Sequence, residues 1–253
     1  MIRVIKVGGR PQADPRLASM IASQWDRVSA GLIVVHGGGD EVSALQASLG
    51  GSTEFVGGRR VTTGRDIDIV RMALSGSANK RLVAALVDEG IAGVGLSGED
   101  AGLIAAKPLD VERLGFVGAP CRVNVGFLYH LLEGGYLPVI SPVSRDATGT
   151  LGSALNVNGD DAAAAIAVAM HATELTLVAD VAGVMQNERV IPSLTADAAR
   201  TLIADGTASA GMRAKLEAAL TAVAGGVARV RIADIGAIGD PIRGTFLSIG
   251  EHS

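Results

Sequence analysis

Val4-Ile5-Lys6-Val7-Gly8-Gly9, near the N-terminus, is an apolar strand pattern that carries one lysine and ends in two glycines. A lysine in a buried strand is unfavourable unless an anion or a carboxylate faces it. The glycines remove two β-carbons where backbone N–H groups could approach a ligand closely. We interpret this stretch as a candidate phosphate site, the alternative being a surface lysine before an ordinary turn.

A second glycine cluster, His36-Gly37-Gly38-Gly39, follows the apolar run 32–35 and precedes a helical pattern over 40–49. A helix N-terminus offers free N–H groups and the positive end of the helix dipole to an anion. Three successive glycines favour an anion site over a tight turn that merely needs glycine. We expect His36 to hold its turn by hydrogen bonds rather than to act in catalysis.

Strand and helix patterns alternate along the whole chain. Further strand patterns cover 92–96, 137–141, 175–179, 228–233 and 245–249. Helical patterns cover 16–30, 65–75, 78–89, 125–133, 195–205 and 211–224, with a break at 76–80 and an alanine-rich helix ending near 170. A hairpin is expected from 103–106 and 114–117, with Lys107-Pro108 in its turn. This order predicts an α/β fold, a three-layer αβα sandwich around a mainly parallel central sheet.

The polar segment 144–152 is the expected boundary between two lobes, 1–150 and 151–253. Ligands of such sheets bind at the carboxyl ends of the strands. Both glycine clusters and the polar segments 97–98, 156–160 and 180–183 fall there. The basic stretch Gly57-Gly58-Arg59-Arg60-Val61-Thr62-Thr63 is expected to form a loop, and a guanidinium reaching inward from it would suit a carboxylate.

Composition excludes several classes of protein. The 253 residues include 3% aromatic residues and carry a formal charge of −4, which argues against a nucleic-acid partner. Cys121 is the single cysteine, which excludes an internal disulfide and a cysteine-cluster metal site. The most apolar run, 162–170, is too short to span a bilayer, and no signal peptide is visible. We therefore expect a cytoplasmic protein without a membrane partner.

GxxxxGK[ST] is absent, and the GxGxxG match at 93–98 overlaps the strand pattern 92–96 instead of forming a turn between a strand and a helix, which disfavours the two nucleotide folds that those motifs mark. The chain instead resembles the amino acid kinase family, through six motifs that occur in that family's order. They are Lys6-x-Gly8-Gly9, His36-Gly37-Gly38-Gly39, Gly58-x-Arg60-Val61-Thr62, Asn156-Val157-Asn158-Gly159-Asp160, Asp180-Val181-x-Gly183 and Gly211-Met212-x-x-Lys215.

Within that family the chain is most similar to members that phosphorylate N-acetyl-L-glutamate with ATP, giving N-acetyl-L-glutamyl 5-phosphate for arginine biosynthesis. The resemblance implies that 1–150 binds the acyl amino acid and dimerises, while 151–253 binds ATP. Gly159 departs from the alanine that the family often has there. Because Lys6 lies so close to Met1, the N-terminal arm of hexameric, arginine-inhibited members is not expected. We therefore expect a homodimer that does not respond to arginine.

The resemblance also implies roles for individual residues. Lys6 and Lys215 would stabilise the transferring phosphoryl group from the substrate and nucleotide sides, and Asp160 would hold both lysines. Substrate binding is implied for Gly38, Gly39, Arg60 and Asn156, and phosphate binding for Gly8, Gly9 and Gly38. Nucleotide binding is implied for Asp180, Val181, Ala182, Gly183, Val184, Ser209, Gly211 and Met212. Mg²⁺ would be carried on the phosphates, without protein ligands.

Three alternatives remain at this point. The acceptor could be an N-succinylated glutamate, or an aminoadipate or glutamate on a small acidic carrier protein, because all these carboxylates need the same phosphate machinery. A nucleotide-binding protein of the same fold without catalysis is the third, although Lys6, Asp160 and Lys215 are all present. Asp160 could also be only a first-turn carboxylate favoured by its helix dipole.

Overall fold

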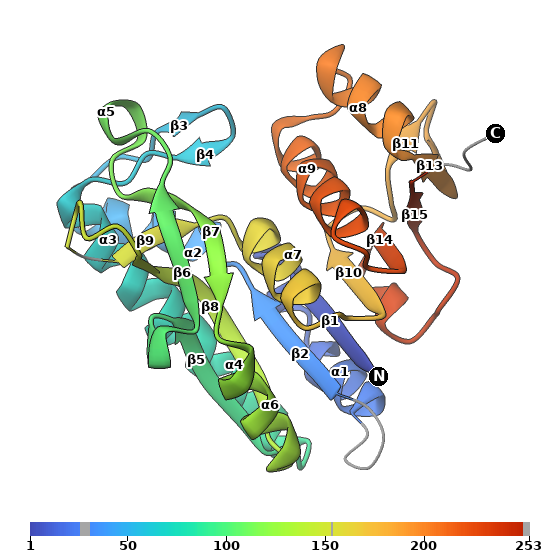
Figure 1. Cartoon of the computed structure of the whole chain (residues 1–253), viewed down its shortest axis with the longest axis horizontal. Helices are drawn as coiled ribbons and strands as arrows, with labels where there is room; N and C mark the ends of the chain where they lie inside the picture. The colour runs from blue at the N-terminus through green and yellow to red at the C-terminus, as the bar shows by residue number, and fades with distance from the viewer. Residues whose placement is uncertain (26–30, 153, 250–253) are drawn as a thin grey trace.

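The computed structural model describes residues 1–25, 31–152 and 154–249. Within them, eleven strands form one sheet (Figure 1). They are β1 (Ile2–Val7), β2 (Gly31–His36), β5 (Gly93–Gly98), β6 (Ile104–Pro108), β7 (Val117–Val123), β8 (Leu137–Asp146), β9 (Ala154–Val157), β10 (Glu174–Val178), β13 (Ser193–Thr195), β14 (Arg229–Ala233) and β15 (Thr245–Ser248). Two separate hairpins pair β3 (Phe55–Val56) with β4 (Arg59–Arg60) and β11 (Met185–Gln186) with β12 (Arg189–Val190).

The helices are α1 (Leu17–Gln24), α2 (Gly39–Ser48), α3 (Gly64–Val70), α4 (Asn79–Asp88), α5 (Val111–Leu114), α6 (Val125–Glu133), α7 (Gly159–Ala169), α8 (Ala196–Ala204) and α9 (Ala210–Ala224). A π-helical segment, Arg71–Ala78, joins α3 to α4. Short 3-10 turns cover Arg10–Ala13, Asp100–Gly102 and Ile235–Ile238. Among the described residues, no helix is long and apolar enough to cross a membrane.

The middle of the sheet is parallel. The strand order is β13-β15-β14-β10-β1-β2-β8-β6-β7-β9, and β5 also pairs with β8. β1 lies between β2 and β10 and runs parallel to both. The antiparallel pairs β14–β15, β6–β7 and β8–β9 lie away from this centre. The predicted mainly parallel α/β sheet is confirmed.

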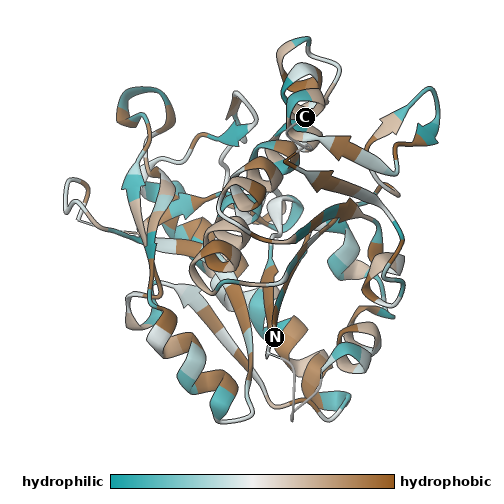
Figure 2. Ribbon diagram, turned by 45° about the vertical axis from the view of Figure 1, so that its right-hand side comes forward, coloured by the Kyte–Doolittle hydropathy of each residue, from teal (hydrophilic) through white to brown (hydrophobic). Residues whose placement is uncertain are grey.

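Helices cover both faces of this sheet because alternate strand residues point to opposite sides. Val4 of β1 belongs to a core shared with α6, α7 and α9, whereas Ile5 and Val7 belong to a core shared with α1 and α4. Lys6 is two residues from Val4, so its side chain emerges on the α7 face of β1. Figure 2 shows hydrophobic residues gathered on the central strands and on the inward sides of the helices.

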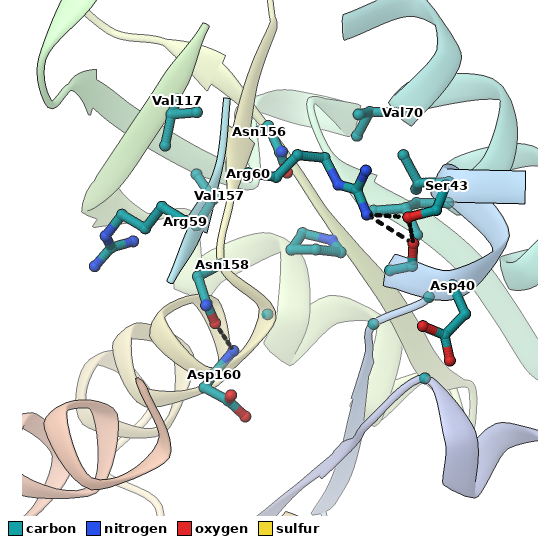
Figure 3. Close-up of a pocket in the computed structure, with 18 of the residues that line it drawn as sticks. Asp40, Ser43, Arg59, Arg60, Val70, Val117, Asn156, Val157, Asn158 and Asp160 are labelled. Atoms are coloured by element: carbon teal, nitrogen blue, oxygen red, sulfur yellow. Dashed lines mark hydrogen bonds between the residues drawn. The ribbon is translucent and has the colours of Figure 1, made fainter. Parts of the chain in front are cut away.

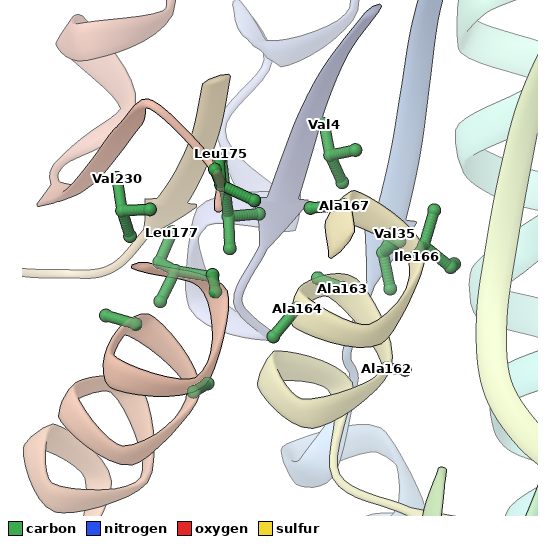
Figure 4. Close-up of a cluster of buried hydrophobic side chains, with 14 of the residues drawn as sticks. Val4, Val35, Ala162, Ala163, Ala164, Ile166, Ala167, Leu175, Leu177 and Val230 are labelled. Atoms are coloured by element: carbon green, nitrogen blue, oxygen red, sulfur yellow. The ribbon is translucent and has the colours of Figure 1, made fainter. Parts of the chain in front are cut away.

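Helix α7 packs against the sheet through very small side chains. Ala162, Ala163, Ala164 and Ala167 are fully buried, and Figure 4 shows this helix beside the buried side chains of β1, β2, β10 and β14. Alanine gives close helix–sheet contact and loses no side-chain entropy on burial. The N-terminus of α7, where Asp160 lies, is therefore held close to the end of β1.

The predicted break between two helices at 76–80 is wrong. The helical run from Gly64 to Asp88 is continuous, because the π-helical segment absorbs these residues. Asn79 begins α4 as a fully buried residue, and its Nδ2 donates to the Val139 carbonyl at 2.9 Å. The local sequence could not indicate that neighbouring strands provide hydrogen-bond acceptors for this buried polar side chain.

The predicted hairpin exists, but its turn was placed wrongly. Lys107 and Pro108 are the last residues of β6 and pair with Ala119 and Gly118 of β7. The connection contains α5, which Asp110 caps by accepting the N–H of Arg113 at 3.0 Å. The strand therefore extends through the predicted turn, and a helical turn follows it instead.

Other differences concern element ends. Helix α1 ends at Gln24, and the remainder of the predicted helix, 26–30, lies outside the described residues. Strand β8 continues to Asp146, so the start of the predicted boundary segment 144–152 is part of the sheet. Arg59 and Arg60 form strand β4 rather than a loop. Glu99, which had no predicted role, forms an ion pair with Arg71 of the π-helical segment at 2.9 Å.

A buried histidine connects β2 to this helical run. His36 is fully buried, its Nδ1 donates to the Gly37 carbonyl at 2.8 Å, and its Nε2 accepts from Asn79 Nδ2 at 3.0 Å. These bonds assign the neutral tautomer protonated at Nδ1. Burial lowers the pKa of His36 to about 4. The expected structural role of His36 is in agreement with these bonds.

This lowered pKa predicts a pH dependence of stability. Between about pH 4 and pH 6.5 the unfolded chain binds a proton at His36 that the folded chain does not, so stability falls as the pH falls through this window. The full difference is about 3 kcal/mol. Urea unfolding at several pH values should show a smaller loss for His36→Gln than for the wild type. His130→Gln, on the exposed surface of α6, should keep the wild-type slope; equal slopes for His36→Gln and wild type would contradict the assignment.

Candidate functional site

A cavity of about 340 Å³ lies at the carboxyl ends of the central strands. Both predicted lobes contribute to it, and Figure 3 shows the lining side chains converging from β4, α2, β9 and α7. Seven of the seventeen residues expected to act in catalysis or binding line it. They are Lys6, Gly9, Gly38, Gly39, Arg60, Asn156 and Asp160.

The charged centre of the site is Asp160 between two lysines. Its Oδ1 lies 2.8 Å from Lys6 Nζ, and its Oδ2 lies 3.0 Å from Lys215 Nζ. The Lys6 and Asp160 side chains are only 7% and 5% exposed, and that of Lys215 is 14% exposed. Two cations and one anion leave a net positive charge in a buried place, which attracts an anionic ligand.

The protonation equilibria reflect this arrangement. Burial lowers the pKa of Lys6 to about 8, although the charge of Asp160 partly opposes the shift. Burial alone would raise the pKa of Asp160, but the nearby charges of Lys6 and Lys215 outweigh it and hold that pKa below its usual value. Asp160 is thus an ionised carboxylate, and an additional anion would favour the charged form of Lys6.

Local sequence explains why Asp160 is so well placed. Asn158 caps α7 by accepting the N–H of Asp160 at 2.8 Å, so the carboxylate stands in the first helical turn. A β-carbon at Gly159 would lie 3.1 Å from Lys6 Cε. Glycine at this position therefore lets the lysine lie close against the start of the helix.

The two glycine turns line the same space. Gly38 has a φ of 146°, and a β-carbon there would lie 2.7 Å from Leu74, so this position requires glycine. Among the described residues, the N–H groups of Gly9, Gly38 and Gly39 donate to no protein acceptor. The N–H of Gly8 donates to the Val178 carbonyl at 3.1 Å. Gly9, Gly38 and Gly39 therefore retain amides for an anion, whereas that of Gly8 is engaged.

Arg60 offers a buried cation on the other side of the cavity. Its Nη2 donates to the Gly39 carbonyl and to Ser43 Oγ, each at 2.8 Å (Figure 3). Its Nη1 donates to Thr53 Oγ1 and Gln46 Oε1. These acceptors are all neutral, and no carboxylate of the described residues lies within ion-pair distance of Arg60. Burial lowers the pKa of Arg60, as expected for a guanidinium without a paired anion.

The remaining wall is mainly apolar, and Asn156 is one of its polar groups. Asn156 donates from Nδ2 to Thr62 Oγ1 at 2.9 Å. Arg59 stands at the edge of the cavity and is paired with Asp161 at 2.8 Å. The apolar lining comes from Val42, Phe55, Val70, Leu74, Val117, Pro142 and Val157. The cavity thus suits a small molecule that combines an anionic group with an apolar one.

Two further cavities are lined by residues of the C-terminal half, and one of them adjoins this site. One of about 240 Å³ shares Gly9, Gly39 and Asp40 with the first and adds Lys215 and Asp180. The next, of about 200 Å³, has mainly apolar walls. It is lined by Val181, Val184, Met185, Leu202, Thr207, Ala208, Ser209 and Met212.

These cavities bring together five of the eight residues expected to bind a nucleotide: Asp180, Val181, Val184, Ser209 and Met212. Ala182, Gly183 and Gly211 do not line them. A β-carbon at Gly183 would lie 2.7 Å from both Val190 and Thr245, so that glycine is needed for packing.

Sequence reasoning missed several lining residues. Arg10 directly follows Gly9, and Asp40 and Ser43 follow the second glycine cluster on α2. Their position one helical turn or less from a recognised motif was the available signal. No sequence signal marked Met185 and Leu202 as cavity residues, because the elements that contain them meet only in the folded chain. In the described part of the chain, no group of three or more His, Cys, Asp or Glu is placed to hold a metal ion.

Comparison with known proteins gives matches over most or all of the chain. The sequence profile of the amino acid kinase family matches residues 1–234. A protein named acetylglutamate kinase from Chloroflexus aurantiacus is 41% identical over 254 residues, covering 100% of this chain and 98% of that protein. Another of that name, from Rhodospirillum centenum, is 41% identical over 91% of this chain and 80% of its own length.

A solved structure is similar over almost the whole length. The crystal structure of smu.665 from Streptococcus mutans UA159 has a TM-score of 0.88 and 29% identity, covering 98% of this chain and 99% of that one. Together with the family profile and the relatives, the sequence and fold place this protein plainly: the chain belongs to the amino acid kinase family.

Proposed function

We propose that this protein transfers the γ-phosphoryl group of ATP to the side-chain carboxylate of N-acetyl-L-glutamate, giving N-acetyl-L-glutamyl 5-phosphate in arginine biosynthesis. The observation that carries the proposal is the buried Lys6–Asp160–Lys215 cluster between two cavities of different chemistry. The full-length similarity to acetylglutamate kinases supports it.

The first cavity suits an acylated amino acid. In this proposal the α-carboxylate binds near Arg60, whose charge has no carboxylate partner among the described residues. The apolar wall that contains Val70 and Leu74 takes the acyl group, and Asn156 offers its amide. The side-chain carboxylate then points toward Lys6. The residues implied for the substrate thus surround one space.

The chemistry needs charge neutralisation more than a base. A glutamate side chain with a pKa of about 4.3 is already ionised at neutral pH, so no proton has to be removed. Lys6 reaches the reacting groups from the acceptor side and Lys215 from the donor side, as an in-line transfer requires. Asp160 touches both ammonium groups and holds them in position.

The donor ATP fits the two further cavities. The phosphates would lie beside Gly9, Gly39 and Lys215, and the base would lie against apolar residues such as Val184 and Met212. Mg²⁺ neutralises part of the phosphate charge when it is bound. Asp160 is occupied by two lysines, so the metal would be carried by phosphate oxygens rather than by this carboxylate.

The surroundings of Arg59 weigh against a carrier-bound substrate. An acidic carrier protein would need free cations at the mouth of the site, yet Arg59 is paired with Asp161 at 2.8 Å. Both side chains are mostly buried. We therefore prefer a small free acceptor to one attached to a protein.

A panel of acceptors tests the proposal. N-acetyl-L-glutamate, N-succinyl-L-glutamate, aspartate and carrier-bound aminoadipate are incubated with ATP and Mg²⁺, and the acyl phosphate is trapped with hydroxylamine. We expect N-acetyl-L-glutamate to give the highest kcat/KM, because its single acetyl group matches the apolar wall. A clear preference for another acceptor would remove the assignment.

The lysines should control the rate rather than binding. Lys6→Ala and Lys215→Ala should each lower kcat by about 10²- to 10³-fold with smaller changes in substrate KM, because each removes a donor to the transition state. Asp160→Asn should also lower kcat, since a neutral amide cannot orient two ammonium groups as a carboxylate does. Lys107→Ala, at the exposed end of β6, serves as the control. If kcat of either lysine variant stayed near that of Lys107→Ala, that lysine would have only a structural role.

Two further expectations belong to the same proposal. Residues 1–150 would provide acceptor binding and the subunit contact, and 151–253 would bind ATP, in a cytoplasmic enzyme. Four apolar residues of the Gly64–Asp88 helical run were candidates for that contact. Three of them, Ile69, Leu82 and Leu86, are buried, whereas Met72 is 51% exposed.

We expect a homodimer in which the exposed face of the Gly64–Asp88 helical run contributes to a two-fold contact. Light scattering at several concentrations should give twice the chain mass, and Met72→Glu should lower that mass because it places charges in the contact. Lys107→Ala, on β6 and outside this helical run, is the control. A monomeric or hexameric wild type would contradict the expectation.

A further inference from the structure

Arg10 occupies a position that the proposed mechanism does not use. It follows the Gly8-Gly9 turn directly and begins the Arg10–Ala13 turn. Its Nη1 lies 2.7 Å from Asp180 Oδ2, beyond β10, and its Nε lies 3.8 Å from Asp40 Oδ2, on α2. One guanidinium thus bridges two carboxylates that come from the acceptor and nucleotide halves of the chain.

The cavity that we assign to the phosphates is also lined by Arg10. Gly9, Gly39 and Lys215 line the same space of about 240 Å³. On its other side, Arg10 borders a larger cavity of about 460 Å³ between the N-terminal turn and α4. Its side chain is 74% exposed, so apart from these two carboxylates little packing holds its orientation.

The charges in this cavity do not suit a triphosphate without Arg10. Asp40 and Asp180 both line it, and each would repel phosphate oxygens. Lys215, the other cation that the described lining contains, is already paired with Asp160 at 3.0 Å. Arg10 is therefore the lining group whose charge can both offset the two carboxylates and reach a phosphate.

We propose that Arg10 is a phosphate-binding residue that exchanges Asp180 for the terminal phosphates of the bound nucleotide. This inference rests on the proposed use of ATP. An exposed Arg–Asp pair is weak, whereas a guanidinium matches phosphate oxygens with two parallel hydrogen bonds. Exchanging Asp180 for phosphate therefore lowers the free energy of the nucleotide complex. The consequence is selectivity for nucleotides that carry β- and γ-phosphates.

The experiment compares nucleotides of different phosphate length. Dissociation constants for ATP, ADP and AMP are measured by titration calorimetry with wild type, Arg10→Ala, Arg10→Lys and Arg16→Ala. Arg16 is the matched control. Like Arg10, it is an exposed arginine paired with an aspartate: its side chain is 69% exposed and lies 2.7 Å from Asp14. Unlike Arg10, it lines neither the acceptor cavity nor the two cavities assigned to ATP.

Arg10→Ala should weaken ATP binding by about 10- to 100-fold, the usual effect of losing hydrogen bonds to a charged group. AMP binding should stay within about twofold of wild type, and Arg10→Lys should retain part of the ATP affinity because it keeps the charge without the fork. Wild-type ATP affinity in Arg10→Ala would overturn the inference. An equal loss for AMP would also overturn it, because the effect would then not depend on the terminal phosphates.

Turnover measured on the same samples separates this inference from the proposed function. Normal phosphorylation of N-acetyl-L-glutamate with an unaffected Arg10→Ala variant would reject only the role of Arg10. Selective loss of ATP affinity in Arg10→Ala, with a wild type that does not turn over N-acetyl-L-glutamate, would reject only the acceptor. A wild type that binds no ATP would reject both.

Discussion

The structure depends on one buried carboxylate that balances two ammonium groups. Asp160 lies within 3.0 Å of both Lys6 and Lys215, and these residues come from α7, β1 and α9. Removing one member of a buried ion pair typically costs about 3–5 kcal/mol, because a charge is left uncompensated. The cluster therefore joins three elements that are distant in sequence. It also leaves a net positive charge between the acceptor cavity and the cavity that Lys215 lines, so the same interaction that orders the fold prepares it for an anion.

Much of this arrangement could be predicted from the sequence. The alternation of apolar runs and helical patterns gave the parallel sheet, because strands buried on both faces are continuously apolar. The need for a carboxylate or anion beside Lys6 followed from its place in a buried strand. The identity of that carboxylate did not follow from pattern, since Asp160 lies 154 residues away along the printed chain; only the family motif indicated it.

The remainder depends on contacts that leave no periodic signal. Gln46, Thr53 and Ser43 surround Arg60 from two elements, and small polar residues of this kind occur in any loop or exposed helix face. Gly183 looked like part of a ligand loop, yet it lies where a β-carbon would meet Val190 and Thr245. In both cases the tertiary neighbours decide the role of the residue.

The π-helical segment Arg71–Ala78 changes the direction in which the side chains after it leave the helical run, compared with an uninterrupted α-helix. With about 3.6 residues per turn, positions nine apart lie on nearly opposite sides of an α-helix. Val70 and Asn79 are nine apart, yet Val70 lines the acceptor cavity and Asn79 holds His36, which precedes the glycine turn. The wider turns of the π-helical segment let one helical run make both contacts. The wall of the acceptor cavity and the glycine turn after His36 are thus both held by the same helical run. A displacement of this run would therefore move both of them together.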